Sequence, residues 1–182
     1  MIRSFIALPL PGEVQSALGE LSRQLVAQSQ GVKWGRPENI HLTLRFLDDT
    51  DPKKVPALSA GLDEIAAAHA PIALRLGPFG AFPNLRKARV LWVGLEEEGE
   101  HLRPLQQAIE TLTRSLGWER ETQEFKPHLT LGRVREGGRV PQEVPAVPPL
   151  EFQADHLELI ESRLRPEGPQ YLTLHYAPLK SN

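Results

Sequence analysis

The chain of 182 residues contains no cysteine. A thiolate zinc site, an iron–sulfur cluster, a cysteine nucleophile and a redox disulfide are therefore excluded. At this length a chain buries roughly 70 % of its unfolded surface, so a hydrophobic core can form without disulfides or a structural metal. The chemistry that remains is hydrolysis, group transfer or binding.

The sequence also lacks an excess of charge of either sign. Lys and Arg number 21 and Asp and Glu number 23, which gives a net charge of −2. A protein that holds long nucleic acid through many phosphates normally carries a basic excess, because counterion release supplies much of its affinity. We therefore expect any nucleic-acid partner to be bound locally.

Long apolar runs are missing as well. The stretch 5–10 is interrupted by Pro9 and is too short for the hydrophobic region of a signal peptide. No run approaches the roughly 18 apolar residues that a membrane span needs. We expect a cytoplasmic protein with no membrane contact.

The apolar residues that are present alternate between helical and strand periods. The expected helices are 14–25, 55–65 and 102–116, and the expected strands are 3–9, 40–46, 72–76, 90–95, 128–134, 152–161 and 171–176. Because several neighbouring strands have no helix between them, we expect antiparallel pairing and an α+β fold. Residues 1–182 should form one domain or two closely packed lobes.

Two helix starts are marked by acidic residues. Asp51 followed by Pro52 is typical of an N-cap and a first helical residue. The acidic cluster 96–100 precedes the third apolar stripe, where negative charge favours a helix N-terminus. We assign the cluster no function.

One tetrapeptide, His-Leu-Thr-Leu, occurs twice, at 41–44 and at 128–131. Leu-Thr-Leu alone also occurs at 172–174, so the information lies in the histidine. Because side chains alternate along a strand, each histidine shares one face with its threonine, and the leucines project from the other face. If the leucines enter the core, two such strands could face one another across a groove.

A pair of imidazoles and a pair of hydroxyls suits displacement at phosphorus. Histidine, with an ordinary pKa of about 6.5, allows His41 and His128 to divide acid and base work near neutral pH. The hydroxyls of Thr43 and Thr130 can donate to phosphate oxygens. Each motif strand offers a single metal ligand with no carboxylate immediately beside it, so we expect neither a metal nor another cofactor.

A single strand histidine is more often a surface residue or a hydrogen-bonded filler than a catalyst. We expect these bland roles for the remaining four histidines, His69, His101, His156 and His175. The matching threonines and matching strand contexts favour catalysis for the motif pair.

The repeated motif, with 39–40 before its first copy and 45–47 after it, resembles the two-histidine phosphoesterase superfamily. Within that superfamily it is most similar to the bacterial and archaeal RNA 2′,3′-cyclic phosphodiesterases, historically called 2′-5′ RNA ligases. Further residues that carry the likeness are 3–8, 91–95, 125–127, 161–164, Gly168 and Tyr171. The chain departs from the family at Asp48, where glycine is usual.

The resemblance implies a bilobal fold in which two antiparallel sheets with flanking helices are related by a pseudo-twofold axis around a central cleft. It implies hydrolysis of an RNA-terminal 2′,3′-cyclic phosphate to a 2′-phosphomonoester, with weak reverse 2′-5′ ligation. By motif position, His41 is the proton donor and His128 the proton acceptor. The expected partners are RNA ends or nucleotides with a cyclic phosphate, and we expect a monomer.

Three further residues are candidates for substrate binding. The resemblance assigns phosphate or nucleotide binding to Arg133, but Arg133 has the strand parity of the motif leucines and reaches the cleft only if a bulge lies near Gly132. Phe46 has the parity of Leu44, so core packing competes with stacking on a nucleobase. Trp34 lies in an expected loop, where a structural role competes with base stacking.

Two other functions stay open at this point. A non-catalytic module that binds RNA ends or nucleotides would use the same donors to hold phosphate. A metal-dependent hydrolase would lose its activity in the presence of a chelator.

Overall fold

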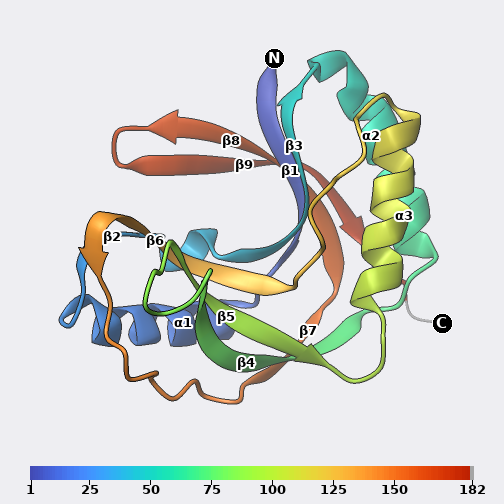
Figure 1. Cartoon of the computed structure of the whole chain (residues 1–182). Helices are drawn as coiled ribbons and strands as arrows, with labels where there is room; N and C mark the ends of the chain where they lie inside the picture. Colours follow the sequence, from blue (N-terminus) through green and yellow to red (C-terminus); the bar gives the residue numbers. More distant parts are fainter. Residues whose placement is uncertain (181–182) are drawn as a thin grey trace.

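In a computed structural model, which describes residues 1–180, the chain forms two antiparallel sheets with helices beside them (Figure 1). In chain order the elements are β1 (Ile2–Pro9), α1 (Gly12–Val26), β2 (Gln30–Trp34), the 3-10 helix η1 (Pro37–Asn39), β3 (His41–Thr50), the 3-10 helix η2 (Pro52–Lys54), α2 (Val55–Ala67), β4 (Ile72–Phe82), β5 (Val90–Glu97), α3 (Leu102–Ser115), β6 (His128–Arg139), β7 (Glu151–Ala154), β8 (His156–Arg165) and β9 (Gly168–Pro178). The α+β prediction is confirmed.

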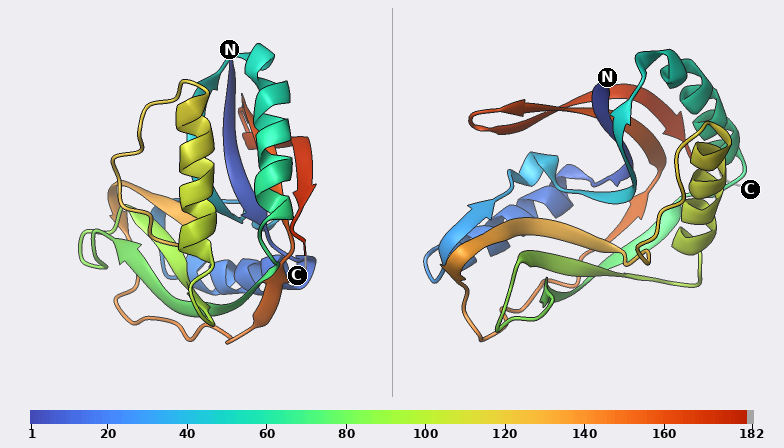
Figure 2. Two further views of the ribbon diagram at one scale, coloured as in Figure 1. Left: turned by 90° about the vertical axis from the view of Figure 1, so that its right-hand side faces the viewer. Right: turned by 45° about the horizontal axis from the view of Figure 1, so that its top comes forward.

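Each sheet contains one of the two motif strands. The four-stranded sheet has the order β3-β1-β8-β9, and the five-stranded sheet has the order β2-β6-β5-β4-β7. In both sheets the motif strand pairs with the strand that lies just before the preceding α-helix. β1, α1 and β3 therefore correspond to β5, α3 and β6. This correspondence is the internal symmetry that the bilobal prediction requires. The two halves are seen from further sides in Figure 2.

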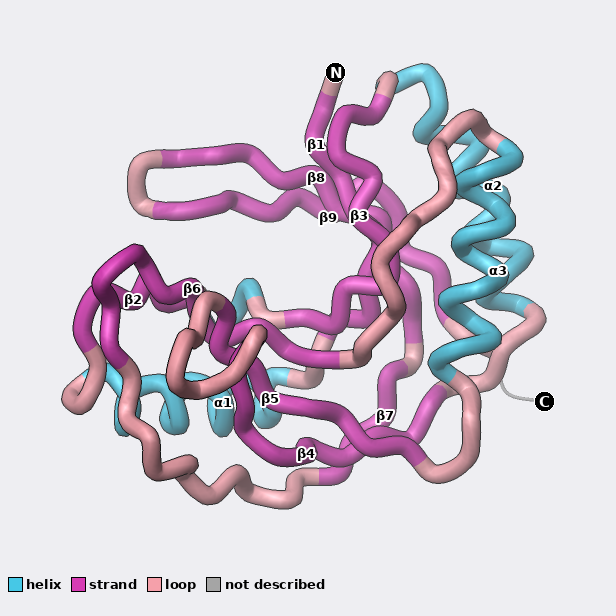
Figure 3. The backbone as a smooth tube through the Cα atoms, in the orientation of Figure 1, coloured by secondary structure: helices cyan, strands magenta, loops and turns pink. Residues whose placement is uncertain are grey.

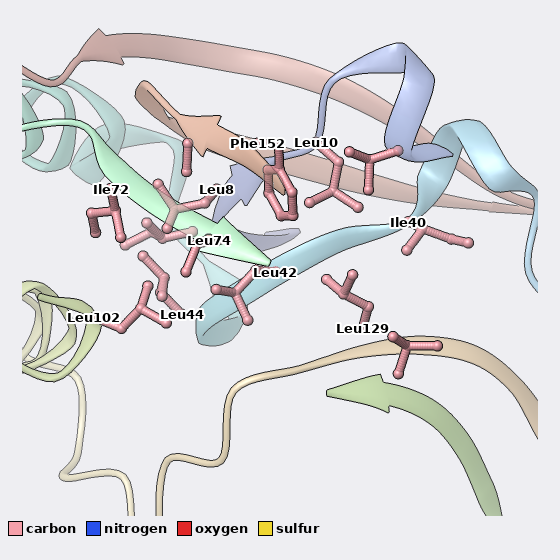
Figure 4. Packing of buried hydrophobic residues seen from close by; sticks show 14 of the residues in the cluster. Leu8, Leu10, Ile40, Leu42, Leu44, Ile72, Leu74, Leu102, Leu129 and Phe152 are labelled. Atoms are coloured by element: carbon pink, nitrogen blue, oxygen red, sulfur yellow. The ribbon is translucent and has the colours of Figure 1, made fainter. Parts of the chain in front are cut away.

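The helices and the leucines of both motifs build a common core. Helices α2 and α3 pack against each other. Helix α2 also packs against β8 and β9, and α3 packs against β3. Helix α1 lies beside the five-stranded sheet (Figure 2). Leu42, Leu44 and Leu129 are buried in one continuous cluster that includes residues of both sheets (Figure 4). This continuity supports our proposal that residues 1–182 form a single two-lobed domain. Within residues 1–180, no helix is both long and apolar enough to span a membrane.

Most strands extend a few residues beyond their predicted bounds, and three differences from the sequence prediction have a clear physical reason. Residues 30–34 form β2 instead of a loop, because β2 adds to the edge of an existing sheet through its backbone. The expected strand 152–161 is two strands in different sheets, and the buried positions change parity at Asp155, where the chain crosses between them. Strand β4 extends to Phe82 because a register shift after Leu76 accommodates the Gly-Pro pair that follows.

The acidic helix starts lie where the sequence predicts them. The carboxylate of Asp51 accepts a hydrogen bond of 3.0 Å from the backbone N–H of Lys53 at the start of η2, which leads directly into α2. The carboxylate of Glu97 accepts from the backbone N–H groups of His101, at 2.9 Å, and Leu102, at 3.3 Å. Both contacts satisfy backbone donors that the first helical turn leaves free.

A buried arginine ties the first motif strand to the segment that precedes the second. The guanidinium of Arg45 forms ion pairs with Glu110 of α3 at 3.0 Å and with Glu121 at 3.2 Å, and it donates to the backbone oxygen of Glu119. Only 8 % of the Arg45 side chain is exposed. A charge at such a depth is stable only while its partners remain in place.

Replacing Arg45 with Met should therefore lower the free energy of unfolding by about 3 kcal/mol or more, because Glu110 would be left without its cation. Urea denaturation followed by circular dichroism measures the loss. Arg23→Met is the matched control: Arg23 pairs with Glu20 at 2.6 Å on the exposed surface of α1, and its loss should cost about 1 kcal/mol or less. Equal losses in the two variants would contradict the role given to Arg45.

Candidate active site

Both motif strands carry a β-bulge at the same position of the motif. In β3, the partners of Ile6 and Ala7 on β1 are Arg45 and Thr43, so Leu44 is an extra residue. In β6, the register against β5 skips Leu131 in the same way. A bulge of one residue reverses the alternation of side chains beyond it. The residues that follow each bulge therefore change faces.

The bulges bring Phe46 and Arg133 to the face that carries the histidine in the sheet of each residue. Arg45 and Gly132 are buried, whereas Phe46 and Arg133 are exposed. Of the two roles that the sequence left open for Phe46, core packing does not hold, since 53 % of this residue is exposed. The bulge that Arg133 needs in order to reach this face is present, and Phe46 and Arg133 occupy equivalent positions in the two halves.

The ring of His41 is held by two hydrogen bonds and two aromatic contacts. Its Nδ1 lies 2.6 Å from the backbone oxygen of Asn39, and its Nε2 lies 3.0 Å from the hydroxyl oxygen of Thr43. The ring stacks on Phe5 at a centroid distance of 4.6 Å and meets Tyr171 edge to face at 5.4 Å. Because a carbonyl only accepts, Nδ1 carries a proton, and Nε2 faces the hydroxyl.

The ring of His128 is oriented in the same way from the other sheet. Its Nδ1 lies 2.6 Å from the backbone oxygen of Lys126, two residues earlier, as Asn39 is two residues before His41. The ring edge meets Phe82 at a centroid distance of 5.2 Å and an interplanar angle of 85°. In both halves a carbonyl two residues upstream thus fixes Nδ1 and directs Nε2 outward as the nitrogen that can react.

The two imidazoles differ in their surroundings. Burial of the His41 ring lowers its pKa from 6.5 to about 4, although the hydrogen bond to Asn39 and the charge of Glu158 act in the opposite direction. At pH 7 the free protein therefore holds His41 in its neutral form. A bound phosphate would raise this pKa, since an anion stabilises the imidazolium.

Tyr171 connects the two halves of the candidate site. It lies on the β8–β9 hairpin, which extends toward the side where β2 and β6 lie (Figure 3). Burial raises the pKa of the Tyr171 hydroxyl, and the positive charge of Arg133 on β6 partly lowers it. The Tyr171 ring also contacts His41. Tyr171 therefore lies near the histidine of the first motif strand and within the electrostatic influence of Arg133 on the second. Strands β3 and β6 are themselves in contact.

Trp34 lies apart from this arrangement. It is half-buried at the end of β2, where it packs against the hydrophobic core and faces Gly132 across the strand pair. A Cβ atom added to Gly132 would lie 3.2 Å from the indole ring. This position favours the structural role of Trp34 over base stacking. In the described part of the chain, no three His, Asp or Glu side chains are grouped so as to hold a metal ion.

The sequence did not identify the aromatic residues that support the two histidines. Phe5, Tyr171 and Phe82 come from three different strands, and no local pattern links them to the motifs. Phe5 and Tyr171 do lie in the segments that carry the family resemblance, which is the one signal that could have found them. Phe82 carries no such signal.

Known proteins are similar to this chain over nearly its whole length. The model of the 2′-5′ RNA ligase superfamily matches residues 10–165. A protein of Archaeoglobus fulgidus named RNA 2′,3′-cyclic phosphodiesterase is 32 % identical over 177 residues, which cover 95 % of this chain and 98 % of the relative. The crystal structure of TT0787 of Thermus thermophilus matches with a TM-score of 0.84 and 31 % identity over 98 % of each chain. Escherichia coli LigT, complexed with 3′-AMP, shares the fold, with a TM-score of 0.79 at 24 % identity over 99 % of each chain.

In the free protein, the His41 imidazole should titrate with a midpoint of about 4. Saturating inorganic phosphate should move the midpoint upward, because the anion favours the charged ring. Nuclear magnetic resonance of the histidine ring signals measures both values. A midpoint at the ordinary value in the free protein, or a downward movement with phosphate, would contradict this description of the site.

Proposed function

This chain belongs to the 2′-5′ RNA ligase superfamily, and from that membership we propose that it hydrolyses RNA-terminal ribonucleoside 2′,3′-cyclic phosphates to 2′-phosphomonoesters. The observation that carries the proposal is the matched orientation of two imidazoles. In each sheet a carbonyl 2.6 Å from Nδ1 leaves Nε2 available for proton transfer. A single binding site between the motifs would then have both an acid and a base.

The proposed reaction needs no metal, because side chains supply each proton transfer. His128 removes a proton from a water molecule, whose oxygen attacks the phosphorus. The bond between phosphorus and the 3′ oxygen breaks, and His41 donates its Nε2 proton to that departing oxygen. The hydroxyls of Thr43 and Thr130 stabilise the charge on the non-bridging oxygens. The phosphate remains on the 2′ oxygen, and the assignment of acid and base follows the family resemblance.

A bound substrate supplies what the free protein lacks for this mechanism. With a pKa of about 4, His41 carries almost no proton at neutral pH in the absence of a ligand. The negative charge of the cyclic phosphate, placed beside the ring, favours the imidazolium. Arg133 would hold the same anion from the opposite strand, and its exposed position on the histidine face supports this role.

The substrate class that we propose is an RNA end or a nucleotide. The complex of LigT with 3′-AMP supports a nucleotide ligand for this fold. Phe46 lies on the same face of the four-stranded sheet as His41, and the centroids of the Phe46 and Phe5 rings are 6.0 Å apart. The exposed Phe46 ring could stack on a nucleobase. The binding role of Trp34, the monomeric state and the cytoplasmic location stay predictions.

The same groups can act in the opposite direction. By microscopic reversibility, a 5′-hydroxyl could replace water and join two RNA ends through a 2′-5′ bond. We expect this ligation to be minor, because water outcompetes a hydroxyl in an open site. The non-catalytic binding module remains the alternative that the following variants test.

His41→Ala and His128→Ala should each lower the hydrolysis rate of a dinucleotide 2′,3′-cyclic phosphate by about 10²–10⁴-fold, the usual contribution of a general acid or base. Circular dichroism should show that both variants fold, and phosphate binding should be largely retained. The matched control is His175→Ala, since His175 lies outside both motifs and bonds Asp63 of α2. Unchanged turnover in the two motif variants would leave only the binding module.

Excess chelator should leave the hydrolysis rate unchanged, because the proton transfers rest on imidazoles. Phosphorus magnetic resonance of the product should show the phosphate on the 2′ oxygen. Loss of activity that is restored by a divalent cation would favour the metal-dependent alternative. A 3′-phosphate product would contradict the departure of the 3′ oxygen.

A further inference from the structure

A carboxylate and its supporting residues lie on the same face of the four-stranded sheet as His41. In the strand register, Thr43 of β3 is opposite Ala7 of β1, Ala7 is opposite Glu158 of β8, and Glu158 is opposite Tyr176 of β9. Residues that are directly opposite in antiparallel strands share a face. Glu158 therefore faces the same side as Thr43 and its hydrogen-bonded partner His41.

The residue between them is small. Ala7 is fully buried and contributes only a methyl group. The rings of His41 and Phe5 stack over this part of β1, and Ala7 packs with Phe5, Ile160 and Tyr171 in a small apolar cluster. An apolar floor of this kind strengthens the interaction between charged groups above it.

The carboxylate of Glu158 is fixed from two sides. Its Oε1 accepts a hydrogen bond from the hydroxyl of Thr173, and its Oε2 lies 2.8 Å from Nε2 of His156. The other ring nitrogen of His156 lies 2.7 Å from the carboxylate of Asp155, and the ring stacks on Tyr176 at 4.2 Å. Only 15 % of the Glu158 side chain is exposed. A half-buried carboxylate held this way costs desolvation energy and cannot turn away freely.

In this network His156 is a hydrogen-bonded side chain, which is one of the two roles expected for it from the sequence. Its two ring nitrogens lie between the carboxylates of Asp155 and Glu158, which hydrogen-bond to it from two sides. Glu158 is the member of the network that acts on His41, whose pKa it raises.

We propose that Glu158 is a positioning residue that acts through His41: its fixed negative charge favours the protonated imidazole that donates to the departing 3′ oxygen. The donor role of His41 rests on the proposed function, whereas the effect of the Glu158 charge on the imidazole does not. This charge opposes the effect of burial, which keeps the ring neutral. Thr173 and His156 contribute by holding the carboxylate on the histidine face.

Other ionisable groups near His41 do not take this role. Tyr171 meets the ring edge from β9, and Arg133 approaches Tyr171 from β6 with a positive charge, which opposes protonation of His41. His156 lies in the Glu158 network, where its ring nitrogens contact Glu158 and Asp155. From β1 the His41 ring stacks on Phe5, which does not ionise.

The test compares Glu158→Gln with Asp63→Asn. Both variants replace a carboxylate, hydrogen-bonded to a histidine at 2.8 Å, with an uncharged amide of the same shape. Asp63 lies on α2 and is not among the groups that shift the pKa of His41. The first measurement is the His41 titration midpoint by magnetic resonance with saturating inorganic phosphate, which requires no turnover.

Glu158→Gln should lower this midpoint by about one unit, and Asp63→Asn should leave it unchanged. With the cyclic dinucleotide, kcat/KM at neutral pH should fall about tenfold in Glu158→Gln, and the acidic limb of its pH profile should move to lower pH. An unchanged midpoint in Glu158→Gln overturns the proposal, whatever the rate does. A lowered midpoint with no loss of rate keeps the charge effect and refutes the donor role of His41 instead.

Thermal unfolding shows whether Glu158→Gln folds. If it does not, Thr173→Val takes its place, because it removes the hydroxyl that orients the carboxylate and leaves the charge in the chain. The midpoint should then fall by a smaller amount. A midpoint equal to that of the unsubstituted protein would overturn the proposal by this second route.

Discussion

The arrangement of the site depends on one extra residue in each motif strand. In a regular strand, the side chain three places beyond each threonine would point into the core, because this position lies on the opposite face from the histidine and the threonine. The bulges at Leu44 and Leu131 reverse the alternation, so that Phe46 and Arg133 join the histidine face while Arg45 and Gly132 turn inward. The leucines stay in the core. The histidine face gains the Phe46 ring in the four-stranded sheet and the Arg133 guanidinium in the five-stranded sheet.

The sequence predicted the parts of this structure that follow from local patterns. The alternation in 41–44 and 128–131 placed the histidines and threonines on one face and the leucines in the core, as observed. The sequence could not decide between the core and the histidine face for Phe46, because the bulge that settles its direction depends on the partner strand. The aromatic supports Phe5 and Tyr171 meet His41 only through pairing between the two ends of the chain, which no period within a single segment encodes.

The two imidazoles have the same orientation but different solvation. Both are fixed through Nδ1 by a carbonyl two residues upstream, so symmetry sets their direction. His41 is additionally enclosed between Phe5 and Tyr171, and burial is the largest influence on its pKa. Within an internal repeat, the pKa of one histidine can therefore be lowered without a change in the motif, by aromatic neighbours that bury its ring.

The strand order also determines when the surroundings of His41 can form. β1 pairs with β8, so that Phe5 is opposite Ile160, and the Tyr171 ring comes from the last strand. A nascent chain emerges from the ribosome beginning with its N-terminus. Both His-Leu-Thr-Leu segments are thus synthesised well before the last strand, which supplies the Tyr171 ring. A chain interrupted after β6 would contain both motifs and Phe5 and still lack the ring that completes the enclosure of His41.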